Sequence, residues 1–153
     1  PVNLARCSAL ISRWSNRPYD RYFVKKVVRS VREREAVGLI PAGRYLVHDR
    51  MSLADFDSAY TAPAGGFRDR DDYYARCSAL PHLSRITVPT VILHAEDDPF
   101  VDAEDLRKAP LGPGVHLHLE GTGGHMGYLS RDLPDRRWLA HALGHYLDRL
   151  LEG

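Results

Sequence analysis

Two short segments of the 153-residue chain carry side chains that could do acid–base chemistry. Asp97 and Asp98 follow an apolar run, and His125 lies further along the chain in a glycine-rich segment. A carboxylate that accepts the Nδ1 proton of a histidine leaves Nε2 free to act as a general base. Asp98 precedes Pro99, which biases its backbone toward extended conformations, and the glycines around His125 permit backbone angles that bulkier residues forbid. The pattern predicts an acid–base pair of Asp98 and His125.

Two predicted strands would position these segments. Residues 88–95 form an almost unbroken apolar and β-branched run, which is typical of a parallel strand covered on both faces. Residues 115–119 alternate between apolar and polar, as in a half-buried strand near a sheet edge. A short crossover helix is expected at 102–108. Because functional groups in open α/β sheets gather at the carboxyl ends of strands, both segments would lie there.

The rest of the pattern is helical. We expect a short helix capped by Asn3, a helix over about 20–35, short helices from Ser52 to Tyr60 and from Asp69 to Cys77, a loop at 61–67 and a C-terminal helix from Trp138. The apolar face of the long helix would hold Tyr19, Tyr22, Phe23, Val27 and Val31. Helices followed by strand–helix–strand–helix indicate an α/β class with a parallel sheet. Since two strands alone make an incomplete sheet, we expect its other strands upstream of Pro1.

Each chemical segment has a simpler explanation when taken alone. Asp-Asp-Pro after a strand is a common helix-capping turn, and a histidine among glycines is commonly a solvated turn residue. Their order favours chemistry, because acid and then histidine, each following a strand, matches the order Ser…Asp…His of the triad in α/β-hydrolases.

A larger set of motifs resembles the YheT-like hydrolases, the AB hydrolase 4 family. In chain order the motifs are YDRYF at 19–23, FD at 56–57, YTAP at 60–63, GF at 66–67, DYY at 72–74, VPT at 88–90, HAEDDPF at 94–100 and GGHMGY at 123–128. The resemblance implies an α/β-hydrolase fold and an esterase-like activity on acyl esters without a cofactor. It also implies that Asp98 is the triad acid and His125 the base. Asp98, and not Asp97, falls on the acid of the family's Gly-x-x-Asp pattern, in which Ala95 replaces the glycine.

The resemblance also divides the chain. Residues 1–85 match the helical lid and connecting segment that α/β-hydrolases insert over the active site, and such lids exclude water. Residues 86–153 match the C-terminal strand–helix–strand–helix part of the core. Phe67, Tyr73 and Tyr74 are candidates for aromatic residues of the lid or the substrate pocket, and ordinary helix packing is the alternative.

The nucleophile of such a triad is not in this sequence. The nucleophile elbow is Gly-x-Ser-x-Gly, and no serine of the chain has a glycine two residues before it. We therefore expect the serine, with the N-terminal half of the fold, upstream of Pro1. The full-length protein would be a serine carboxylesterase similar to acylglycerol lipases, and this chain alone would be inactive. The alternative is a non-catalytic, hydrolase-like binding module.

Composition limits the partners. A net charge of +1 with no basic run gives no argument for binding nucleic acid. No apolar stretch approaches the ~18–20 residues that a membrane span needs. Two cysteines are too few for a disulfide framework, so a cytoplasmic location is expected. His141 and His145 have a zinc-ligand spacing, but Ala142 replaces the glutamate of that motif, so no metal site is expected.

Overall fold

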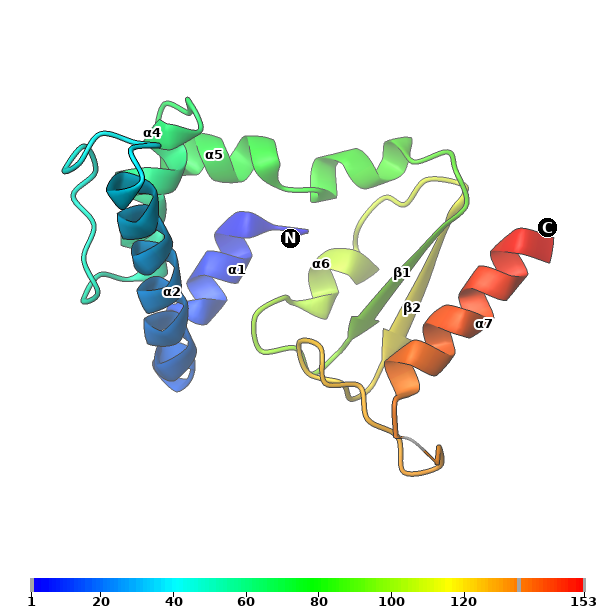
Figure 1. Cartoon of the computed structure of the whole chain (residues 1–153). Coiled ribbons are helices and arrows are strands. Elements are labelled where there is room, and N and C mark those ends of the chain that lie inside the picture. Colours follow the sequence, from blue (N-terminus) through cyan, green and yellow to red (C-terminus); the bar gives the residue numbers. More distant parts are fainter. Residues whose placement is uncertain (1, 135, 153) are drawn as a thin grey trace. The chain divides into compact units, whose positions relative to one another are not determined.

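The computed structural model describes residues 2–134 and 136–152 (Figure 1). These residues form two compact units, Asn3–Ser78 and Ala79–Gly153. The first unit is helical, and the second contains the two strands of the described chain. In this described part, every helix is too short or too polar to cross a bilayer.

Helices and short helical turns build the first unit. They are α1 (Leu4–Ile11), η1 (Trp14–Asn16), α2 (Arg17–Ala36), α3 (Leu53–Phe56), η2 (Asp57–Thr61), α4 (Ala62–Ala64) and α5 (Arg70–Cys77). Asn3 caps α1 as predicted, because its side chain accepts a hydrogen bond from the Arg6 amide at 3.1 Å. Ser52 and Asp55 form a reciprocal capping box at the start of α3, so the local sequence determines where that helix begins.

The buried face of α2 differs from the predicted one. Tyr19 and Tyr22, which were assigned to the apolar face, are 50% and 56% exposed. Asp20 is buried, and its Oδ1 accepts a hydrogen bond from the Leu53 amide at 2.8 Å. The prediction was right for Val31, which is 1% exposed, and wrong for the two tyrosines. Packing on Phe56 selects valines instead, including two that the prediction did not name, Val24 and Val28. The core cluster consists of Val24, Val28, Val31 and Phe56.

The segment 61–67, predicted as a loop, begins as a helix. A π-helical turn, η2, follows α3 directly and continues into α4. Pro63 lies in the first turn of α4, directly after the π-helical turn. Gly66 then adopts a φ of 75°, a left-handed conformation that glycine accepts without a steric penalty, and the helix ends there.

The second unit has the predicted strand–helix–strand–helix order. Its elements are η3 (Leu80–Arg85), β1 (Thr90–Ala95), α6 (Ala103–Arg107), β2 (Val115–Glu120) and α7 (Trp138–Glu152). The two strands are parallel, and the register runs from Thr90 opposite Val115 to Ala95 opposite Glu120. Figure 1 shows α6 and α7 on opposite sides of the strand pair. The predicted α/β class is therefore confirmed.

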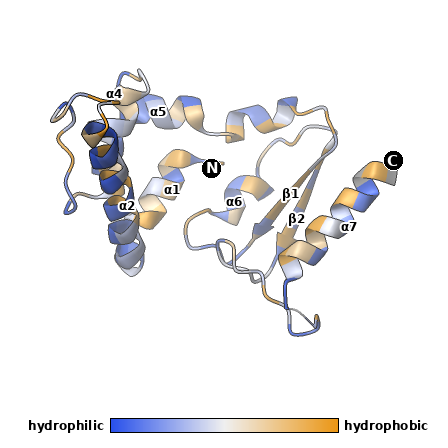
Figure 2. Cartoon of the chain, viewed as in Figure 1, coloured by the Kyte–Doolittle hydropathy of each residue, from blue (hydrophilic) through white to orange (hydrophobic). Residues whose placement is uncertain are grey.

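Apolar surface in the second unit remains uncovered by the described residues. Residues 90–93 of β1 are only partly buried, although the sequence predicted a strand covered on both faces. Figure 2 shows apolar residues along α7, and three of its leucines are 49%, 59% and 84% exposed: Leu143, Leu147 and Leu151. Each strand has the other as its sole neighbour in the described sheet, and a two-stranded sheet is marginal by itself.

We expect the 153-residue chain to self-associate through this apolar surface, because burying exposed leucines and a free strand edge is favourable. Sedimentation velocity over a concentration series measures the association. Leu147→Glu should weaken it roughly tenfold or more, since burial of one leucine contributes about 1.5–3 kcal/mol. Circular dichroism should show unchanged helix content. A chain that stays monomeric at every concentration and melts in one sharp transition contradicts this expectation.

Candidate active site

Parallel pairing brings two loops together at the carboxyl ends of β1 and β2. Ala95 and Glu120 are the last paired residues, and the Glu96 amide donates to the Glu120 carbonyl oxygen at 2.7 Å just beyond them. The chain after β1 enters the loop that carries Asp97 and Asp98. The chain after β2 enters the glycine-rich loop that carries His125. The two segments singled out in the sequence therefore lie side by side.

Asp98 and His125 are in direct contact. His125 Nδ1 lies 3.0 Å from Asp98 Oδ2, and since a carboxylate can only accept, Nδ1 carries the proton. The other oxygen, Oδ1, accepts hydrogen bonds from the Phe100 amide at 2.8 Å and the Val101 amide at 3.1 Å. The Asp98 side chain is 3% exposed. The two backbone amides thus fix the position of the carboxylate that contacts the imidazole.

The imidazole of His125 faces outward. Its side chain is 51% exposed, and its ring meets the Phe100 ring edge-on with centroids 5.2 Å apart. Among the residues that the structure describes, none is hydrogen-bonded to Nε2. With Nδ1 protonated against Asp98, Nε2 holds the free lone pair, so it can accept a proton from an approaching hydroxyl group. The catalytic roles of the two residues remain predictions.

His94, the penultimate residue of β1, supports the turn that follows it. Its Nε2 donates to the Val101 carbonyl oxygen at 3.2 Å, and its Nδ1 lies 4.0 Å from Asp98 Oδ2. The ring is buried. His94 therefore packs beneath the Asp98 carboxylate and ties the end of the strand to the turn that presents it.

The loop that carries His125 requires glycine at two positions. Gly124 has a φ of 55°, and a Cβ atom on Gly123 would lie 2.5 Å from the Tyr128 ring and 3.0 Å from the Ala95 Cβ. The Gly127 amide donates to the Gly123 carbonyl oxygen at 2.8 Å and closes a turn around His125. The glycine-rich composition had pointed to such a close approach. One of the two groups approached, Tyr128, lies in the same loop, and the other, Ala95, ends β1.

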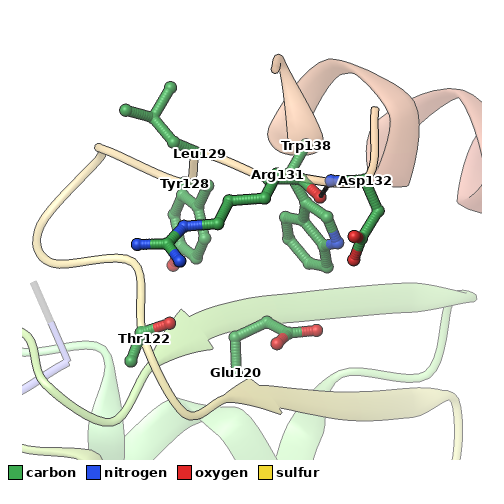
Figure 3. A pocket seen from close by; sticks show the side chains of 8 residues that line it. Glu120, Thr122, Tyr128, Leu129, Arg131, Asp132 and Trp138 are labelled. Carbon is green, nitrogen blue, oxygen red and sulfur yellow. Dashed lines mark hydrogen bonds between the residues drawn. The ribbon is translucent and has the colours of Figure 1, made fainter. Parts of the chain in front are cut away.

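A pocket of about 440 Å³ lies beside this loop (Figure 3). The Tyr128 ring stacks on Trp138 in its wall, with centroids 5.5 Å apart. Burial, and then the nearby carboxylates of Asp98, Asp97 and Glu120, raise the pKa of Tyr128. Asp98 and His125 do not line the pocket, which is formed by Glu120, Thr122, Tyr128, Leu129, Ser130, Arg131, Asp132 and Trp138. No sequence pattern had predicted this pocket.

The three candidate lid aromatics lie in the first unit and contact one another. The rings of Phe67 and Tyr73 are 5.2 Å apart, and those of Tyr73 and Tyr74 are 5.4 Å apart. Tyr74 is 5% exposed and donates a hydrogen bond to Asp57 Oδ2 at 2.7 Å. Burial raises the pKa of Tyr74. Tyr74 therefore packs within its own unit, and a lid or pocket role for the three residues remains a prediction.

His118 of β2 is engaged in polar contacts with protein groups. His118 Nε2 lies 2.8 Å from Glu120 Oε1, and its Nδ1 is hydrogen-bonded to the Tyr146 hydroxyl group. Within the described ranges, no group of three or more histidine, cysteine, aspartate or glutamate side chains could hold a metal ion.

Comparison with known proteins identifies the family. The chain is 33% identical to YheT of Escherichia coli, an esterase by name, over 99% of the chain and 46% of that protein. The chain belongs to the YheT-like α/β-hydrolases. It is also 32% identical to a monoacylglycerol lipase of Saccharomyces cerevisiae over 63% of the chain, and 30% identical to the human phospholipase ABHD3 over 66% of it. No family model and no solved structure matches the chain significantly.

These relatives confirm the resemblance and the α/β-hydrolase fold inferred from the motifs. The chain spans about half the length of YheT, and 21% and 24% of the lipase and the phospholipase. This YheT-like chain thus corresponds to only part of the length of these relatives.

Gly123→Ala should disrupt the site, because its methyl group would collide with the buried Tyr128 ring. We expect the free energy of unfolding to fall by about 1–3 kcal/mol, as is typical of overpacking, and the NMR signal of the His125 Nδ1 proton to weaken. Urea denaturation and NMR measure the two effects. Gly121→Ala is the matched control, since a methyl group at that position would meet no atom within 4 Å. Equal effects of the two substitutions contradict the expectation.

Proposed function

We propose that Asp98 and His125 are the acid and base of a catalytic triad in a serine-type carboxylic-ester hydrolase, similar to esterases and acylglycerol lipases. The single observation that carries the proposal is the 3.0 Å contact between His125 Nδ1 and the buried carboxylate of Asp98. The esterases and lipases among the relatives support the same class of reaction.

In the proposed reaction, a serine attacks the acyl carbonyl carbon while His125 Nε2 removes the hydroxyl proton. The imidazolium then donates this proton to the departing alkoxide, which leaves an acyl-serine. His125 next activates a water molecule, and the attack of this water releases the carboxylic acid and regenerates the serine. Asp98 keeps Nδ1 protonated throughout and stabilises the positive imidazolium. No step requires a cofactor.

The serine and the oxyanion-hole donors belong, in this proposal, to a segment outside the 153 residues. The basis is that the chain contains no Gly-x-Ser-x-Gly and spans about half of YheT. Residues 1–85 would serve as the lid and connecting segment, with Phe67, Tyr73 and Tyr74 near a small-molecule acyl-ester substrate. We place the protein in the cytoplasm, because Cys7 and Cys77 are free thiols.

The first test uses the chain alone. Without a nucleophile, the imidazole has no hydroxyl group to activate, so we expect the hydrolysis of p-nitrophenyl butyrate to equal that of a His125→Ala variant. The measurement is the release of p-nitrophenolate over buffer. Turnover by the chain that disappears in the His125→Ala variant would show that the nucleophile lies within the 153 residues.

The second test uses a longer protein in which the chain follows the strand and Gly-x-Ser-x-Gly segment of its own gene. Asp98→Asn should lower kcat by roughly 10⁴-fold, because the imidazole loses the correct tautomer. His125→Ala should lower it by roughly 10⁴–10⁶-fold. His141→Ala, at an exposed position of α7, should leave kcat unchanged.

The alternative is a binding module that keeps the hydrolase fold without catalysis. A gene whose upstream segment carries an inert residue in place of the serine, or a longer protein whose kcat is unaffected by His125→Ala, would support this alternative and overturn the hydrolase proposal.

A further inference from the structure

A second carboxylate acts on the His125 loop. Asp97 Oδ1 accepts hydrogen bonds from the Gly123 amide at 2.9 Å and from the Gly124 amide at 2.7 Å. Gly124 immediately precedes His125. Consecutive aspartates at the end of β1 therefore contact the same loop: Asp98 at the imidazole, and Asp97 at the backbone just before it.

We propose that Asp97 is a positioning residue that holds the His125 loop in the geometry required for the contact with Asp98. The expected effect on catalysis rests on the proposed function, whereas the effect on the geometry of the loop does not. Within the part of the chain that the structure describes, the hydrogen bonds of Asp97 go to the amides of Gly123 and Gly124 and not to the imidazole, so its effect passes through the loop backbone.

The loop needs such a restraint because of its composition. Glycine has more conformational freedom than any other residue, so a segment with glycines at 121, 123, 124 and 127 loses much entropy when it orders. His125 itself is half exposed, so burial does little to fix its ring. Two adjacent amides that converge on one charged oxygen make short, charge-assisted hydrogen bonds.

The turn after β1 is built to present both carboxylates. The Asp98 amide donates to the Ala95 carbonyl oxygen at 3.3 Å, which closes the turn that contains Asp97. The Asp98 carboxylate is then secured by the amides of Phe100 and Val101. Since Asp97 and Asp98 share one turn, the loop backbone and the imidazole are positioned from a common support.

A purely solvated surface carboxylate is the competing explanation, because Asp97 is an exposed residue. The two explanations differ in their consequences. A solvated carboxylate contributes only its charge, so any exposed aspartate in the same unit should be equivalent to it. A positioning carboxylate contributes an acceptor at one place, so a neutral acceptor of the same shape should retain part of its effect.

The experiment is NMR on the 153-residue chain below its association threshold, which needs no turnover. In Asp97→Ala, the amide protons of Gly123 and Gly124 should exchange with solvent about tenfold faster or more. The Nδ1-protonated tautomer of His125, read from its ring nitrogen shifts, should lose population to the Nε2-protonated form. Asp97→Asn keeps an acceptor oxygen, so it should show intermediate values. Asp148→Ala removes the same charge from an exposed site on α7 and should resemble the unmodified chain.

Unchanged glycine amides and an unchanged His125 tautomer in Asp97→Ala overturn the proposal, as does an equal change in Asp148→Ala. If Asp97→Ala unfolds the second unit, Asp97→Asn alone decides between the two explanations. The measurements are again the exchange of the Gly123 and Gly124 amide protons and the tautomer of His125. An unfolded Asp97→Ala combined with an unperturbed His125 tautomer in Asp97→Asn would also overturn the proposal.

A kinetic arm in the longer protein separates this proposal from the proposed function. Asp97→Ala should lower kcat by about 10–100-fold, as is typical when a group that orients an active-site residue is lost, with little change in KM. Asp97→Asn should recover part of the loss. If the longer protein is inactive while the NMR changes occur as expected, the hydrolase function fails and the positioning role stands.

Discussion

The parallel pairing of β1 with β2 determines where the chemistry-bearing residues lie. Its register ends with Ala95 opposite Glu120, so both strands end, and the loops that follow them begin, at the same edge of the sheet. Asp98 then lies three residues beyond one strand end, and His125 five beyond the other. In an antiparallel pair these two strand ends would lie at opposite edges of the sheet. Every contact between the two loops therefore depends on this direction of pairing.

Within the site, the loop that follows β1 fixes the positions of the groups in the loop that follows β2. The Asp98 side chain is 3% exposed and its carboxylate is bound by backbone amides, whereas the His125 side chain is 51% exposed. The glycines of the second loop provide a chain that can fold closely against Tyr128 and Ala95 but that has little stiffness of its own. The two aspartates of the first loop offset this deficit, because one binds the backbone of the second loop and the other binds its imidazole.

The predictable parts of the fold are those with local causes. Asn3, Ser52 and Asp69 mark helix starts because capping involves residues only two or three positions apart. The strands follow from apolar and alternating runs. The buried face of α2 was mispredicted because it depends on what packs against the helix, namely Phe56 and the start of α3. The helical turn through Pro63 was missed because proline at the start of a helix resembles a loop signal.

For the site, the sequence alone determined the chemical groups and their order: an acid after one strand, and a histidine among glycines after the next. It also determined the family through motifs spread along the chain. Only the tertiary structure decided that Asp97 binds the loop backbone while Asp98 binds the imidazole. It also decided that the Tyr128 ring and the Ala95 Cβ atom leave no room for a side chain at Gly123. The physical reason is range. Propensity and capping act between near neighbours in the chain, whereas the contacts of Asp97 and Asp98 with the second loop form only after two strands have paired.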